Sequence, residues 1–416
     1  MLSQPWRARR WRGRLALVGV AGLMSLATLA ALPPAAARAA VADSIQDKQQ
    51  WVLNMLGVDG AWAVTRGAGV TVAVIDSGVN PDVSDLSGSV ITGPDYTRVK
   101  TSPSSRNWGV HGTWMASLIA GHGHGGGLDG VTGIAPRARI LSIRVIPDRG
   151  DPHYGKYERE QETVIQQSLA DGIRYAVAHG AQVISMSIGY SAPSATVRAE
   201  LQQAYDRGVV VIASAGNSGG PSGSARPDDA PESFPADYPG VISVGAVNTN
   251  GVVANFSSDN LSVKVAAPGV SVPAQGRDGE YWLVSGTSPA CALVAGVAAL
   301  IKSKYPRLAP DLVASALTST TTGRPADGYD SQVGFGIVDA AAALTKAGRL
   351  AGVRPVATSI NATVRYHGVL PPAPVRPRGS GELILFSLLA LASLALIAAA
   401  GTRLAVLRRA QGRANQ

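Results

Sequence analysis

Three residues of the chain have side chains that could together activate a nucleophile: Asp76, His111 and Ser288. A serine hydroxyl is a poor nucleophile at neutral pH and needs a neighbouring base. An imidazole base in turn needs a carboxylate to hold its tautomer and to stabilise the imidazolium that forms. His111 and Ser288 each open a segment of helical character, so both are expected in the first turn of a helix. The set predicts acyl transfer through a covalent serine intermediate.

The elements that must position these residues alternate between apolar runs and segments of helical period. The runs are Val70 to Ile75, Ile140 to Ile146, Val183 to Gly189 and Val209 to Asn217, with helical segments between the later ones. This is a βαβαβ series, which predicts a parallel sheet covered by helices on both faces. Ligands of open sheets bind beyond the carboxyl ends of the strands, where Asp76, Gly189 and Asn217 lie.

Four short blocks resemble the signature motifs of the subtilisin-like protease family. They are Val74-Ile75-Asp76-Ser77-Gly78-Val79, His111-Gly112-Thr113, Ala215-Gly216-Asn217 and Gly286-Thr287-Ser288, and Gly334-Phe335-Gly336-Ile337-Val338-Asp339-Ala340 resembles the segment that closes the family's domain. The order Asp, His, Ser is that of subtilisin and not of chymotrypsin or the α/β-hydrolases. The resemblance covers about residues 57–345. It implies a subtilisin-like three-layer α/β fold with a mostly parallel central sheet flanked by helices.

The resemblance also implies roles for the residues around the triad. Asn217 would donate its side-chain amide to the oxyanion of the tetrahedral intermediate, with the backbone N–H of Ser288 as the second donor. Two segments would line the primary specificity pocket and pair with the substrate backbone: Ser187, Ile188, Gly189, Ala215 and Gly216. Backbone pairing gives affinity with little sequence selectivity, so the preferred substrate residue is left open.

The nucleophile block departs from the family pattern. Pro289 follows the serine where the family usually has methionine or another bulky apolar residue, and Ala292 and Leu293 replace the later proline and the residue after it. Proline at the first helical position is tolerated because its missing N–H would have no intrahelical partner. Both oxyanion donors are retained, so activity is still expected.

Composition limits the other classes of function. The 416 residues are 46% apolar and 16% charged, which is enough to bury a large core. The net charge is +9, and the arginines near the two ends account for it, which leaves about −1 for everything between them. A nucleic-acid partner is therefore not expected. The one cysteine, Cys291, excludes an intramolecular disulfide and falls on an apolar helix as a packing residue.

Both ends of the chain carry apolar stretches that predict export and anchoring. Residues 1–42 have the layout of a secretory signal peptide, with an uncleaved anchor as the alternative. Residues 383–400 hold no charged residue and could cross a bilayer, with a core helix as the alternative. Arginines follow this stretch, which predicts a cytoplasmic tail and an extracytoplasmic protease domain in a single-pass protein of the cell membrane. The predicted order is signal peptide 1–42, N-terminal extension 43–65, peptidase domain 66–345, proline-rich linker 346–382, transmembrane helix 383–400 and basic tail 401–416.

No cofactor or metal is expected. His122, His124 and Asp129 lie in a glycine-rich stretch and make an incomplete ligand shell, so a flexible surface loop is favoured over a metal site. The oxygen-rich ligands that calcium needs are absent there. Two polar segments, Arg98 to Asn107 and Asp148 to Glu160, are interpreted as insertions or surface loops.

This order of segments resembles that of the mycosins, the membrane-anchored proteases of type VII secretion systems. The stretch Gln49 to Leu56, followed by Ala61-Trp62, resembles the N-terminal extension that wraps their domain. The resemblance implies an endopeptidase that cleaves exported proteins or peptides at the outer face of the membrane, in association with the secretion complex. Two alternatives remain: a structural subunit of that complex with dispensable catalysis, and an acyl-transferring relative with Asp148 to Glu160 as its lid.

Overall fold

The computed structural model describes residues 34–99, 101–126, 129–158, 162–219, 232–352, 387–389, 391–393, 395–396 and 398–403. The described residues up to Gly352 belong to one compact unit, and those from residue 387 onward belong to a second. Most of the predicted signal peptide and of the proline-rich linker lies outside the described residues, and the predicted transmembrane segment 383–400 is described only in part. Within the described residues, no helix has the length and apolar character needed to cross a membrane.

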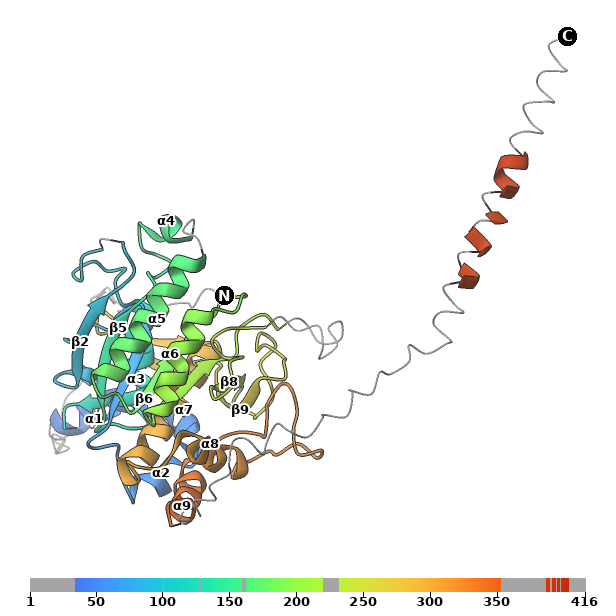
Figure 1. Ribbon diagram of the computed structural model, residues 1–416. Coiled ribbons are helices and arrows are strands. Elements are labelled where there is room, and N and C mark those ends of the chain that lie inside the picture. Colours follow the sequence, from blue (N-terminus) through green and yellow to red (C-terminus); the bar gives the residue numbers. More distant parts are fainter. Residues whose placement is uncertain are drawn as a thin grey trace, which may run out of the picture. The chain divides into compact units, whose positions relative to one another are not determined.

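A seven-stranded sheet forms the centre of the first unit (Figure 1). Its strands lie in the order β2-β5-β1-β6-β7-β8-β9, and all neighbouring pairs are parallel. In chain order they are β1 (Thr71–Asp76), β2 (Val90–Asp95), β5 (Arg139–Arg144), β6 (Val183–Met186), β7 (Val210–Ser214), β8 (Ile242–Val247) and β9 (Val263–Pro268). The parallel sheet predicted from β1, β5, β6 and β7 is confirmed, and β2, β8 and β9 extend it at both edges.

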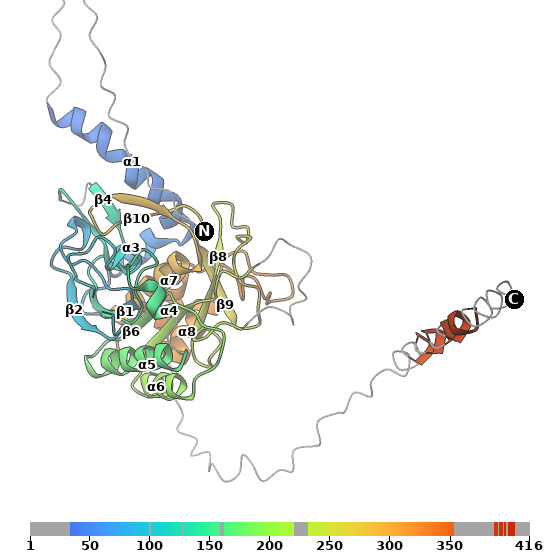
Figure 2. The same ribbon diagram turned by 90° about the horizontal axis from the view of Figure 1, so that it is seen from above.

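Helices cover both faces of this sheet (Figure 2). On one face lie α5 (Glu162–Ala178) and α6 (Ala195–Asp206), and on the other lie α3 (Val110–Ala120), α7 (Thr287–Lys304), α8 (Pro310–Ser319) and α9 (Ala340–Ala351). The remaining elements are α1 (Pro34–Met55), α2 (Val58–Trp62), α4 (Tyr154–Glu158), the 3-10 helix η1 (Ser84–Leu86) and two hairpins, β3 (His122–His124) with β4 (Asp129–Thr132) and β10 (Val272–Gln275) with β11 (Tyr281–Val284). The layers are those of the three-layer α/β fold expected from the sequence.

The alternation of β1 decides which face each of its side chains meets. Val72 and Val74 are buried with side chains of α3 and α7, whereas Ala73 and Ile75 are buried with side chains of α5 and α6. Successive side chains of a strand point to opposite faces of the sheet. Asp76 therefore continues the series of Val72 and Val74 and faces the layer that contains α3 and α7.

The end of α1 and the whole of α2 are fastened to this unit. Gln49 is only 1% exposed. Its Nε2 donates to the carbonyl oxygen of Thr132 at 2.6 Å, and its Oε1 accepts from the N–H of the same residue at 3.0 Å. Trp62 Nε1 donates to the carbonyl oxygen of Ile134 at 2.8 Å. The described part of the segment 43–65 therefore packs as an integral piece of the domain.

The glycine-rich stretch around His124 contributes β3, which pairs with β4 in a hairpin. The prediction of a flexible loop for this stretch is therefore wrong for the paired residues. His124 Nδ1 lies 2.7 Å from Oδ1 of Asp85, a carboxylate with no exposed surface. The second oxygen of Asp85 accepts from the N–H of Val131 at 2.7 Å and from the hydroxyl of Tyr281 at 3.2 Å. Donors from the protein thus satisfy both oxygens of this buried carboxylate. No cluster of three or more His, Cys, Asp or Glu residues that could hold a metal occurs in the described part of the chain.

His124→Ala is expected to destabilise the protein by about 1–3 kcal/mol, because it removes a donor from a carboxylate that water cannot reach. Thermal unfolding measured by circular dichroism would test this. His122→Ala is the matched control, since both nitrogens of that ring contact only backbone carbonyl oxygens. Equal losses in the two variants would contradict a special role for the contact between His124 and Asp85.

Candidate active site

The ends of β1 and α3 bring Asp76 and His111 together. Asp76 is 1% exposed at the carboxyl end of β1. The Nδ1 atom of His111 lies 2.8 Å and 3.0 Å from its two carboxylate oxygens. The N–H of Ser77 also donates to Asp76 Oδ1, at 2.7 Å. A carboxylate in this place keeps the proton on Nδ1, which leaves Nε2 of His111 to accept another proton.

The residues that follow His111 let α3 approach β1 closely. A Cβ atom at Gly112 would stand 2.1 Å from the carbonyl oxygen of Gly78, so the close approach requires glycine. Thr113 Oγ1 accepts from the N–H of Asn80 at 2.9 Å. The motif thus fixes the first turn of α3 against the loop after β1.

The pKa of His111 lies above its ordinary value of 6.5. Burial of the ring lowers the pKa, but the charge of Asp76, its hydrogen bond and the charge of Asp148 raise it by more, against a smaller opposing effect of Arg149. The side chain of His111 keeps 29% of its surface exposed. A reacting group can therefore reach this imidazole. The ring is neutral, and so able to act as a base, at pH values above its raised pKa.

The turn before α7 fixes the amide of Asn217. Its Oδ1 accepts from the N–H of Thr287 at 2.9 Å and from Oγ1 of Thr287 at 3.1 Å. A Cβ atom at Gly286 would lie 3.5 Å from Asn217 Nδ2 and 3.6 Å from the backbone nitrogen of Ser288. Two nitrogens from separate segments therefore lie close to one point beside Gly286.

The segments expected to line the specificity pocket lie at the same edge of the sheet. Ser187 Oγ donates to the carbonyl oxygen of Ser288 at 3.1 Å, which links the end of β6 to the first turn of α7. Ile188 is half-buried against the cluster under α5 and α6. Ala215 is buried, and its N–H donates to the carbonyl oxygen of Val244 at 3.0 Å.

Ser233 also lies beside these segments, although the sequence around it contains no motif that would indicate this. Its Oγ would lie 2.8 Å from a Cβ atom at Gly189 and 3.2 Å from a Cβ atom at Gly216. The hydroxyl therefore stands between the two segments that were expected to line the pocket. Only a three-dimensional structure could find this residue, because no motif surrounds it.

The described residues include no hydrogen bond between His111 and Ser288. Asp76 contacts His111 directly, and Asn217 and Ser187 contact the first turn of α7. Hydrogen bonds between catalytic groups are often long before substrate binds and tighten in the complex.

The family model of the subtilases matches residues 67–336. The chain belongs to the subtilase family. It is 36% identical to subtilisin DY of Bacillus licheniformis over 257 residues, which make up 62% of the chain and 85% of that protein. The chain spans 61% of the length of several other Bacillus subtilisins.

Solved structures extend the comparison of this subtilase to the mycosins. MycP1 from Mycobacterium smegmatis is 32% identical with a TM-score of 0.58, over 71% of this chain and 84% of that one. A chain in the periplasmic assembly from the ESX-5 inner membrane complex is 30% identical with a TM-score of 0.60, over 71% of this chain and 83% of that one. The subtilase described here is a serine endopeptidase related to the mycosins of type VII secretion.

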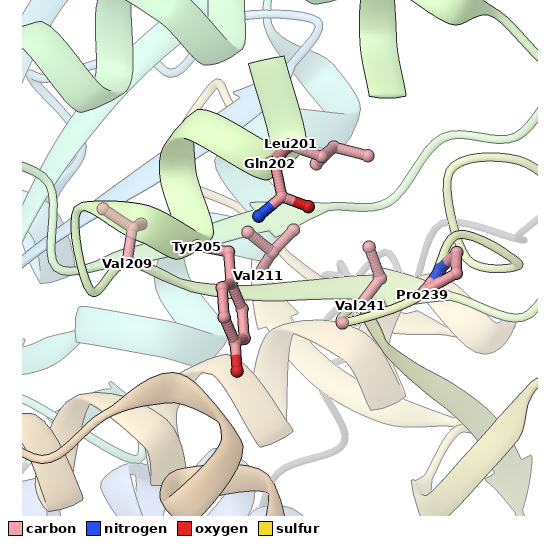
Figure 3. A pocket seen from close by; sticks show the side chains of 8 residues that line it. Leu201, Gln202, Tyr205, Val209, Val211, Pro239 and Val241 are labelled. Atoms are coloured by element: carbon pink, nitrogen blue, oxygen red, sulfur yellow. The ribbon is translucent and has the colours of Figure 1, made fainter. Parts of the chain in front are cut away.

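A cavity of about 220 Å³ in this subtilase lies away from these residues, between α6 and the starts of β7 and β8 (Figure 3). Its lining consists of Leu201, Gln202, Tyr205, Val209, Val211, Pro239, Gly240 and Val241. Val209 and Val241 directly precede β7 and β8, so the cavity lies at the amino edge of the sheet. Asp76 and Asn217 lie at the carboxyl edge, and the cavity is therefore separate from the candidate active site.

Cys291 of the subtilase has no exposed surface on α7. Its Sγ lies 3.7 Å from Oγ of Ser185 and 3.7 Å from the carbonyl oxygen of Met186. Burial raises the pKa of its thiol to about 12. Only the thiolate is a good nucleophile, so a buried thiol with this pKa is unreactive at neutral pH. This agrees with the packing role predicted for Cys291.

Proposed function

We propose that the chain cleaves peptide bonds through Ser288, with His111 as the general base and acid and Asp76 as the carboxylate that orients it. The observation that carries this proposal is the approach of both Asp76 oxygens to Nδ1 of His111, at 2.8 Å and 3.0 Å. A single defined tautomer with Nε2 ready to accept a proton is what a serine nucleophile requires.

The residues then act in a fixed order. Ser288 Oγ attacks the scissile carbonyl carbon while its proton passes to Nε2 of His111. Asn217 Nδ2 and the N–H of Ser288 donate to the oxyanion that forms. His111 gives the proton to the leaving amine, the C–N bond breaks, and water repeats the sequence on the acyl-enzyme.

A fluorophosphonate probe tests this assignment. The full chain is expected to form one covalent adduct, located on Ser288 by peptide mass spectrometry, and Ser288→Ala should remove it. Thr287→Ser is a useful companion variant, because it keeps the hydroxyl that binds Asn217 and should still be labelled. Absence of an adduct on a folded wild-type chain would refute the proposal.

We further propose that Ser233 limits the size of the side chain accepted before the scissile bond, in a pocket formed with Ser187, Ile188, Gly189, Ala215 and Gly216. Ser233→Val is expected to lower the ratio of kcat/KM for a substrate with phenylalanine at that position to kcat/KM for the same substrate with alanine there, by about tenfold or more. Valine has two methyl groups where serine has one hydroxyl, and they would fill the space that a phenylalanine ring needs. Kinetics on a matched pair of peptides measure this ratio. An unchanged ratio would mean that Ser233 lies outside the pocket.

Membrane attachment is also proposed, with a signal peptide 1–42, an extension 43–65, a peptidase domain 66–345, a linker 346–382, a transmembrane helix 383–400 and a cytoplasmic tail 401–416. The support is the uncharged apolar sequence of residues 383–400 and the arginines after it. A chain that ends at residue 382 should appear in the soluble fraction, whereas one that ends after Arg403 should sediment with membranes. Release of both or of neither would contradict the anchor.

A role beside catalysis is the second candidate. Its support is the similarity to a chain in the periplasmic assembly from the ESX-5 inner membrane complex. We propose that the chain associates with a type VII secretion complex and stabilises it. Secretion that persists in Ser288→Ala but stops when the chain is deleted would support this role. Loss of secretion in both cases would make catalysis the essential contribution.

A further inference from the structure

Asp148, in the segment interpreted as a surface loop, contacts the start of the helix that carries His111. Its Oδ2 accepts from the N–H of Val110 at 2.9 Å, and its Oδ1 accepts from the N–H of His111 at 2.9 Å. Asp148 is only 8% exposed. One carboxylate from a different segment thus binds the first two N–H groups of α3.

The first turn of α3 has no cap of its own. Gly109 precedes the helix with a left-handed backbone, at φ 72°, and no side-chain cap bond, and the first turn contains no acidic residue. The first N–H groups of a helix have no intrahelical partners and carry partial positive charge. Asp148 supplies acceptors for the N–H groups of Val110 and His111 together with the negative charge, and Ser77 Oγ accepts from the N–H of Gly112 at 3.1 Å.

The backbone of Asp148 is linked through Asp151 to a buried cation. Its carbonyl oxygen accepts from the N–H of Asp151 at 2.9 Å. Asp151 Oδ2 lies 3.1 Å from Nη2 of Arg144, whose side chain is 1% exposed. Arg144 Nε donates to the carbonyl oxygen of Ser77, the residue after Asp76, at 3.1 Å. The guanidinium group of Arg144 therefore contacts both Asp151, which binds the backbone of Asp148, and Ser77, which follows Asp76.

The charges that act on His111 come from the residues at the end of β1 and after β5. Asp76 at the end of β1 and Asp148 after β5 both favour the protonated imidazole, and Arg149 opposes them. Trp114 of α3 presents only an aromatic ring to the imidazole, with ring centres 6.2 Å apart. Asp148 is thus the second carboxylate in the surroundings of this base.

We propose that Asp148 is a positioning residue for the peptidase reaction, which fixes the first turn of α3 and places a second carboxylate close to His111. The proposal rests on the assignment of His111 as the general base. In this proposal the segment that begins at Asp148 holds the helix of the general base in place and does not act as a lid over the acyl-enzyme.

The pH dependence of kcat/KM tests the effect of the charge. Asp148→Asn removes the charge with little change of size, so protonated His111 is less favoured and the acid limb is expected to move to lower pH by about one unit. Asp148→Ser keeps one acceptor for the helix without the charge, and it should show the same displacement if the asparagine variant does not fold. Asp327→Asn, at an exposed position, makes the same change in net charge and should leave the limb in place.

The helix-fixing role has a separate readout. On the alkaline plateau, where His111 is neutral in all variants, Asp148→Ala is expected to lower kcat about tenfold or more with little change in KM, because the imidazole is less well held. A folded Asp148→Asn or Asp148→Ser variant with the wild-type acid limb would overturn the proposal. A wild-type chain that fluorophosphonate does not label at any pH would instead refute the proposed function.

Discussion

Ser288→Ala, His111→Ala and the double variant are each expected to lower kcat for a peptide substrate by one common factor of about 10⁶. The hydroxyl and the imidazole act as a unit: the imidazole removes the proton of the hydroxyl, so neither side chain contributes to the attack when the other is absent. Burst-free steady-state kinetics on purified full-length variants measure the three factors. Asp76→Asn should cost less, about 10⁴, because the imidazole remains but its tautomer is no longer held.

Non-additivity is the informative part of this series. If the double variant were slower than either single variant by a further large factor, the two side chains would act independently and the triad assignment would be wrong. His179→Ala provides the control, since this histidine is exposed at the end of α5 and is expected to leave kcat unchanged.

Gly286→Ala is expected to lower kcat by about 10²–10³ while the fold is largely kept. The added methyl group would lie 3.5 Å from Asn217 Nδ2 and 3.6 Å from the nitrogen of Ser288, at the point between the two proposed oxyanion donors. The residue also has φ 152°, where a side chain adds roughly 1–3 kcal/mol of strain. A small loss of stability with a large loss of turnover is therefore the expected combination.

Gly279→Ala separates the two causes. This glycine also has a positive φ, 86°, but a Cβ atom there would meet nothing within 4 Å. The control should lose stability through strain and keep its turnover. Comparable losses of kcat in both variants would show that backbone strain, and not the obstruction of the oxyanion position, explains the effect at Gly286.

The parts of the site that the sequence predicts are those with a local signal. Asp76 ends an apolar run of β-branched residues, and His111 and Ser288 each open an apolar helical stretch. These patterns depend on neighbours within a few residues, so the carboxyl edge of the sheet and the starts of α3 and α7 could be inferred before the structure.

The parts that the sequence does not predict depend on contacts between distant segments. Asp148 lies 37 residues from His111 along the chain, and its polar surroundings are typical of a surface loop. Ser233 meets Gly189 and Gly216 only because β6 and β7 end side by side. The hairpin at His124 depends on Asp85, a residue in a separate segment. Long-range partners of this kind leave no periodicity to detect.

The alternation of β1 has a consequence for the insertions and deletions that the gene can tolerate. Removal of one residue between Val72 and Ile75 would exchange the two faces of the strand and turn Asp76 toward α5 and α6, away from His111. Removal of two residues would restore the faces but shorten the pairing with β5 and β6. Insertions or deletions in surface connections do not change which face of the sheet a strand side chain meets. Natural variation in chain length should therefore be confined to those connections, while the strand that ends at the aspartate keeps its length.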